Sequence, residues 1–157
     1  METYFKIVLF FFVMNFFTPE EKFYKREFYE TGILKAEGWR KGNSRVDHWI
    51  FYYPDGKIWS KGHFRDNKMH GYWYFYAENK KLLKEGHYFL GKAENWWIFF
   101  EGTRSKKVQY RNDKKEGFAL CYNNRKLEKV EKYFNDTKLD EWTDVYSFKL
   151  DNPEVKF

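Results

Sequence analysis

The chain repeats itself with a period of 24 residues, and this period limits the folds that are open to it. The segment YYPDGKIWSKGHFRDNKMHGYW, which begins at Tyr52, aligns without gaps with the segments that begin at Phe28 and at Tyr76. Looser copies follow at a spacing of 22, so that about five repeats lie between residues 28 and 142. Two columns of the alignment are invariant in the first three copies: Trp49, Trp73 and Trp97, and Gly38, Gly62 and Gly86. Such a period is typical of arrays in which each unit packs only on its neighbours.

Each repeat has the pattern of a β-hairpin. The sequence Pro-Asp-Gly at 54–56 is a turn signal, and it predicts a first strand over 57–64. A polar connection is predicted over 65–70 and a second strand, rich in aromatic residues, over 71–76. Turn signals interrupt each run too early for a helix. The sequence therefore predicts an all-β fold, an elongated antiparallel meander of stacked β-hairpins.

Alternation along the strands separates the two faces of the predicted sheet. One column alternates in charge and is typical of a solvated face: Glu37, Lys61, Glu85 and Lys107. Another starts with Arg40 and then holds only rings, as expected of a packed face: Phe64, Tyr88, Tyr110 and Tyr133. The repeated glycine shares the packed face, where glycine normally weakens a strand. We expect Trp73 to lie flat on Gly62, with Phe75 on the same face and Tyr72 and Tyr74 on the other.

The unit YYPDGKIWSKGHFRDNKMHGYWYFY resembles the MORN-repeat variant found in many bacterial proteins. The resemblance extends over residues 28–142 and is strongest in the first three repeats. It implies an elongated antiparallel sheet with a binding role and no enzymatic activity. Proteins that look like this often carry the label of antitoxin component of a toxin–antitoxin system, and other MORN arrays are described as scaffolds or membrane-associating modules.

The later repeats depart from this pattern at two glycine columns. Val108 and Glu131 replace the mid-repeat glycine, which predicts less regular hairpins there. The glycine of the Gly71 column is replaced in three copies by Asp47, Asn95 and Asp140. Asp and Asn tolerate unusual backbone angles better than most residues.

Composition and charge limit the classes of partner that this chain is expected to bind. The 7 Trp, 13 Tyr and 18 Phe argue against disorder. The net charge of +6 comes from interspersed residues of both signs, without a basic stripe or a nucleic-acid motif, so no nucleic-acid partner is expected.

The residues that usually carry chemistry are scattered. No catalytic or cofactor motif occurs, and we expect no enzyme, no cofactor and no metal. His63 and His87 lie one repeat apart, which is about 9–10 Å across two strand spacings and too far for one metal ion. The single cysteine, Cys121, falls in the Phe75 column and has no partner for a disulfide.

The first residues form a separate segment. Tyr4–Phe17 is mostly apolar, so residues 1–18 are interpreted as a hydrophobic leader, either a signal or anchor or a capping segment. Residues 19–157 are then the MORN-like repeat domain. A signal or anchor would place the protein in the cell envelope or outside the cell; otherwise it is cytoplasmic.

The candidate binding residues are Trp39, Trp59, His63 and His87. Tryptophan among charged neighbours is a common arrangement at binding hot spots. The alternative is that these rings pack against the N-terminal segment or another protomer. The first function hypothesis is a protein-binding module with an antitoxin-like role. The second is an envelope or membrane-associated structural protein whose basic loops, Lys106–Lys107 and Lys114–Lys115, face an anionic membrane surface.

Overall fold

The computed structural model describes residues 21–155, and it confirms the predicted all-β meander. The predicted leader, residues 1–18, lies outside the described residues. Within them the elements are β1 (Lys22–Phe28), β2 (Leu34–Lys41), β3 (Ser44–Tyr52), β4 (Ile58–Arg65), β5 (Lys68–Tyr76), β6 (Leu82–Phe89), β7 (Lys92–Glu101), β8 (Arg104–Arg111), β9 (Lys114–Asn123), β10 (Lys126–Phe134), β11 (Thr137–Trp142) and α1 (Val145–Asp151).

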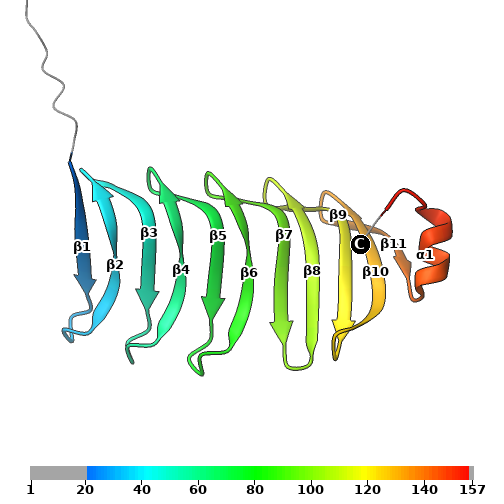
Figure 1. Cartoon of the computed structure of the whole chain (residues 1–157), viewed down its shortest axis with the longest axis horizontal. Coiled ribbons are helices and arrows are strands. Elements are labelled where there is room, and N and C mark those ends of the chain that lie inside the picture. Colours follow the sequence, from blue (N-terminus) through cyan, green and yellow to red (C-terminus); the bar gives the residue numbers. More distant parts are fainter. Residues whose placement is uncertain (1–20, 156–157) are drawn as a thin grey trace, which may run out of the picture.

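The strands form one open sheet in chain order. Each strand pairs antiparallel with its sequence neighbours, and β1 and β11 are the two ends of the sheet. Curved strands stand side by side along the long axis, and α1 lies at the β11 end (Figure 1). Neither β1 nor α1 was among the predicted elements. Between residues 21 and 155, no helix has the length and apolarity needed to cross a bilayer.

The connection predicted over 65–70 is wrong in length, because the structure makes it a two-residue turn. Asp66 and Asn67 have φ values of 49° and 64°, and Lys68–His70 already belong to β5. Two positive φ values allow the tightest hairpin turn, and Asn and Asp adopt them readily. The same geometry recurs at Asn112–Asp113 and Asn135–Asp136. Successive turns are linked, since the Asn67 N–H donates to the Arg45 carbonyl over 3.0 Å.

The predicted contact of glycine with tryptophan is confirmed. A Cβ at Gly62 would fall within the ring of Trp73, and Gly38 and Gly86 meet Trp49 and Trp97 in the same way. The Trp73 side chain is fully buried, although the sheet is a single layer here. We call this side of the sheet the tryptophan face and the other side the opposite face.

A β-bulge fixes each tryptophan. The registers of β2–β3, β4–β5 and β6–β7 shift next to residues with positive φ, among them Gly71 at 76°. The His63 carbonyl at this bulge accepts the Trp73 indole N–H over 3.0 Å, as the Trp39 and His87 carbonyls do in the neighbouring repeats. Asp47 and Asn95 also have positive φ, as their residue types predict, whereas Asp140 does not.

The rings of the tryptophan face form one continuous series, the ring stack. Its centroids are separated by 5.9 to 6.3 Å, in the order Trp49, Phe51, Trp73, Phe75, Trp97, Phe99. Arg45 closes the first end, with its guanidinium 4.7 Å from the centroid of the Trp49 ring.

In the last repeats the core changes face. Leu120, Val130, Trp142 and Phe148 form a buried cluster on the opposite face, where α1 covers the sheet. The strands around Val108 and Glu131 are paired, with register shifts between Val108 and Tyr110 and between Lys132 and Tyr133. Glycine is dispensable at these positions, because the following strand places Ala119 opposite Val108 and Glu141 opposite Glu131, where the earlier repeats have a tryptophan.

Candidate binding surface

Aromatic and imidazole rings form three edge-to-face pairs across the first six strands of the opposite face. Each pair joins two neighbouring strands, and the centroid separations are 5.4, 5.3 and 4.8 Å for Tyr24–Trp39, His48–His63 and Tyr72–His87. We call these six residues the ring row. Trp39 is 40% exposed, and His63 and His87 are also exposed.

The strand register brings the ring row together. Tyr24 pairs directly with Trp39, His48 with His63, and Tyr72 with His87. Since directly opposed side chains lie on one face, each pair must meet. His63 and His87 are two strands apart with β5 between them.

Charged and hydroxyl groups border the ring row. Glu37 accepts hydrogen bonds from the Tyr52 hydroxyl at 2.7 Å and from Arg26 at 3.2 Å. The Lys61 ammonium lies 5.3 Å from the centroid of the Tyr74 ring. The row is therefore a strip of rings between polar groups that are already engaged.

The surroundings of the row shift two of its pKa values. The pKa of His48 is lowered by partial burial and by the charges of His63 and Lys61. Burial and the nearby Glu85 carboxylate raise the pKa of Tyr72 to about 12. Both shifts favour the neutral form of the group.

The structure brings three of the four candidate residues into the row and leaves the fourth outside it. Trp39, His63 and His87 are members. Trp59 is 44% exposed but makes its ring contact with Phe51, at 6.1 Å. Sequence reasoning missed Tyr24, His48 and Tyr72, because columns of a repeat align equivalent residues and do not show which residues pair across strands.

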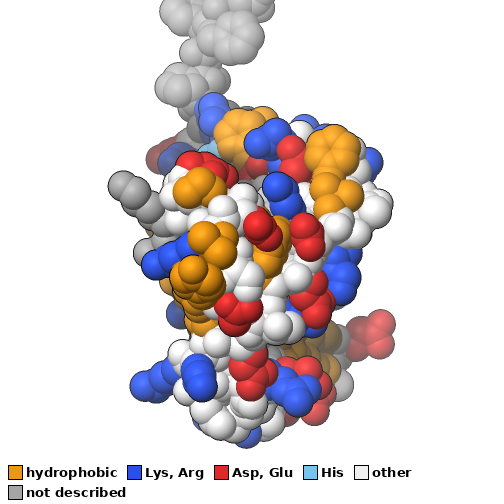
Figure 2. Space-filling model, turned by 90° about the vertical axis from the view of Figure 1, so that its right-hand side faces the viewer, with side chains coloured by type: hydrophobic (Ala, Val, Ile, Leu, Met, Phe, Trp, Pro, Cys, Tyr) orange, Lys and Arg blue, Asp and Glu red, His pale blue; other side chains and the backbone are white. Residues whose placement is uncertain are grey.

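Beyond β6 the row gives way to cations and then to α1. The Lys107 ammonium lies 4.6 Å from the centroid of the Trp96 ring, and that of Lys132 lies 5.8 Å from the Phe118 ring. Phe148 of α1 packs edge-on against Phe118 at 5.4 Å. At this end of the molecule, apolar side chains are separated by charged ones (Figure 2). The uncovered rings are therefore those of β1 to β6.

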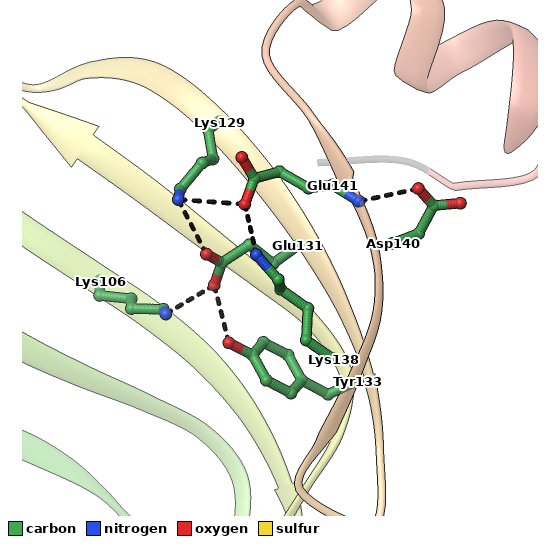
Figure 3. Close-up of polar contacts among 7 residues, drawn as sticks. All are labelled: Lys106, Lys129, Glu131, Tyr133, Lys138, Asp140 and Glu141. Atoms are coloured by element: carbon green, nitrogen blue, oxygen red, sulfur yellow. Dashed lines mark hydrogen bonds and ion pairs between the residues drawn. The ribbon is translucent and has the colours of Figure 1, made fainter.

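The tryptophan face ends in a buried ion-pair network (Figure 3). Glu131 is 4% exposed and contacts Lys106 at 2.6 Å, Lys129 at 2.9 Å and the Tyr133 hydroxyl at 3.0 Å. Burial opposes ionisation of Glu131, but these hydrogen bonds outweigh it and lower the pKa to about 2. Glu141 in turn binds Lys129 at 3.2 Å. The network holds its lysines in fixed positions.

The described residues show no group of three or more His, Cys, Asp or Glu side chains placed to hold a metal ion. The closest approach of two imidazoles is the edge-on contact of His48 with His63. The half-buried Cys121 thiol has a raised pKa, because burial and Glu131 disfavour the thiolate. A protonated thiol is a poor nucleophile.

Comparison with known protein families matches the MORN repeat variant at residues 48–66 and 69–89. The matched residues extend from His48 in β3 to the end of β6 and include four members of the ring stack and four of the ring row. A comparison with curated proteins found no match. MORN repeats are non-catalytic modules that mediate interactions with proteins or membrane lipids. Two of the Gly–Trp hairpin repeats of this chain, at residues 48–66 and 69–89, are therefore similar to the MORN repeat variant.

Proposed function

We propose that the protein is a non-catalytic repeat module that binds a protein partner through the ring row. The observation that carries the proposal is a strip of rings on a continuous sheet, exposed except for the half-buried Tyr72: Tyr24, Trp39, His48, His63, Tyr72 and His87. Exposed aromatic groups that are fixed by their neighbours lose little entropy on binding and commonly dominate binding energy.

The test is copurification of the tagged full chain from its native cells, compared among three versions. Wild type should retain a stoichiometric protein partner, and Trp39→Ala combined with His87→Ala should lose most of it. Trp59→Ala is the matched control, since Trp59 is equally exposed but lies outside the ring row. Equal loss with Trp59→Ala, or full retention by the double variant, would contradict the proposed surface.

The narrower form of this proposal is an antitoxin-like role, which the family resemblance suggests. It requires that the copurified partner be toxic when expressed alone and harmless when expressed with this chain. A partner without toxicity would leave the protein-binding module and exclude the antitoxin-like role.

A second candidate function is binding to an anionic membrane. It is favoured by the side of the sheet at which two-residue turns join the strand ends, which we call the turn edge. Phe89, Leu90 and Phe134 are 56%, 40% and 55% exposed there, beside the exposed Lys68 and Lys92. Apolar groups next to cations suit the surface of an anionic bilayer. The basic loops predicted at Lys106–Lys107 and Lys114–Lys115 are wrong, because the first pair lies inside β8 and the second begins β9.

Vesicle cosedimentation tests this candidate. The full chain should bind vesicles that contain phosphatidylserine more strongly than pure phosphatidylcholine vesicles. Phe89→Ser with Phe134→Ser should weaken binding several-fold. Phe28→Ser is the matched control, because Phe28 is 57% exposed at the other edge of the sheet. Equal effects of the two changes would exclude the turn edge as the contact.

A further inference from the structure

The ring stack stops where the next repeat loses both of its rings, with Ala119 at the tryptophan position and Cys121 at the phenylalanine position. Phe51, Phe75 and Phe99 occupy one repeat position, and Cys121 occupies the same position in the next repeat. Each of these phenylalanines contacts a stack tryptophan; for example, the Phe75 and Trp97 centroids are 6.2 Å apart. Because neither Ala119 nor Cys121 carries a ring, Phe99 is the last ring of the stack.

A cavity lies beside this terminal ring. Its volume is about 670 Å³, and the residues that matter here are Phe99, Arg104, Lys106, Cys121, Tyr122 and Lys129. The thiol of Cys121 and the ring of Phe99 are both half-buried, so the cavity opens to solvent. Its volume is in the range of ligand pockets and exceeds that of a single aromatic ring.

The repeat itself shows what fits in this position. Phe75 pairs with Lys84 across the strands, and the Lys84 ammonium lies 4.7 Å from the centroid of the Phe75 ring. Cys121 pairs in the same way with Lys129. A ring placed over Cys121 would therefore take the place on the tryptophan face that Phe75 has in its repeat, and it would meet the Lys129 ammonium as Phe75 meets Lys84, which is a favourable cation–π contact.

The cation is already held for this contact. Lys129 donates to Glu131 at 2.9 Å and to Glu141 at 3.2 Å. An ammonium has three donor hydrogens, and it keeps its charge in these bonds while its position is fixed. A ring that enters the cavity would thus find the ammonium in place and would not have to order a flexible side chain.

We propose that this cavity binds an aromatic side chain of a peptide segment, which occupies the ring position that Cys121 leaves open. Room beyond one ring accommodates the flanking main chain, and Arg104 and Glu101 line the mouth as partners for its polar groups. The site is on the tryptophan face. It is therefore separate from the ring row, and each can fail without the other.

Cys121 provides the measurement, because it is the only cysteine of the chain. The rate of its alkylation by N-ethylmaleimide is followed in the full chain with increasing N-acetyl-tryptophan amide, N-acetyl-leucine amide or indole. The tryptophan amide should slow alkylation several-fold, and at lower concentration than the other two. Lys129→Ala should weaken this protection. No protection, or equal protection by the leucine amide, would overturn the site, and stronger protection by indole would overturn its assignment to a peptide.

A second variant tests the cavity without any ligand. Cys121→Phe should restore the missing ring and raise the melting temperature, whereas Cys121→Ser should leave it nearly unchanged. Ser60→Phe is the control for added bulk, because Ser60 is 1% exposed on the same face and has no such space. A lower melting temperature for Cys121→Phe, comparable to that of Ser60→Phe, would show that no ring fits there.

Discussion

One atom position, that of the Cβ at the mid-repeat glycine, decides whether a repeat can hold its tryptophan. The Trp73 ring occupies the space that a side chain at residue 62 would need, and its indole N–H is bonded to the carbonyl of the next residue, His63. Where the facing residue is Ala119 or Glu141, the strand carries Val108 or Glu131 in place of glycine. The glycine is thus required by the ring and not by the strand.

Replacement of Gly62 by Val should therefore be severe. The added Cβ and methyl groups would displace the Trp73 ring, and overpacking of this kind costs roughly 1–3 kcal/mol or more. Lys61→Ala, on the opposite face, removes a contact with Tyr74 that is worth about 1 kcal/mol at most. Urea unfolding of both variants measures the difference, and equal free energies of unfolding would contradict the assignment of faces.

At the scale of single elements, β10 differs from the strands that precede it. It replaces the stack of rings with the ion-pair network of Glu131, Lys106 and Lys129. Removal of one partner from a buried ion pair is costly, because the other charge is left uncompensated. This strand should therefore be the most pH-sensitive part of the array.

The pH dependence follows from the sign of the Glu131 shift. Its pKa in the folded protein is about 2, against an ordinary 4.5, so the folded state binds fewer protons than the unfolded state between these values. The stabilisation, on the order of 3 kcal/mol, is complete above pH 4.5 and is lost as the pH falls toward 2. Glu131→Gln should be less stable at pH 7 and lose less on acidification. Unfolding from pH 7 to pH 2 measures this, with the exposed Glu128→Gln of the same strand as control; parallel curves for wild type and Glu131→Gln would disprove it.

At the scale of the whole molecule, the protein is a linear series of hairpins whose contacts are with sequence neighbours. Every strand pairs only with the strands before and after it, and the buried cluster passes from one face to the other along the series. The stability of such arrays is approximately a sum over units and their interfaces.

Removal of one complete period should therefore leave a folded protein. Deletion of residues 53–76 joins Tyr52 to Ala77 and repeats the natural Tyr76–Ala77 junction. It lets β3 pair with β6, with Trp49 opposite Gly86 as Trp73 is in the full chain. We expect a β-rich circular dichroism spectrum and a cooperative transition at a lower melting temperature. Deletion of residues 65–76 is the control, because it removes a single strand and, in the register of β5 with β6, sets Lys61 in place of Trp73 against Gly86. If the variant that lacks residues 53–76 does not fold, the linear description is contradicted, whether or not the control variant folds.

Some features could be predicted because they recur within the period. The 24-residue repeat and the alternation of side chains determine the meander, its two faces and the contact of Trp73 with Gly62, since these depend on neighbours at fixed sequence spacing. Asp144 was a signal for α1, as its carboxylate caps the helix by accepting the Ser147 N–H at 2.8 Å, but a seven-residue helix outside the period is weakly marked.

The ring row, the Glu131 network and the cavity at Cys121 were decided only by the tertiary structure. Alternation assigns a side chain to a face, whereas its neighbours depend on the register between strands. That register is set by bulges at residues such as Asp47 and Gly71 and by two-residue turns, and one residue more or less in either would bring different side chains together.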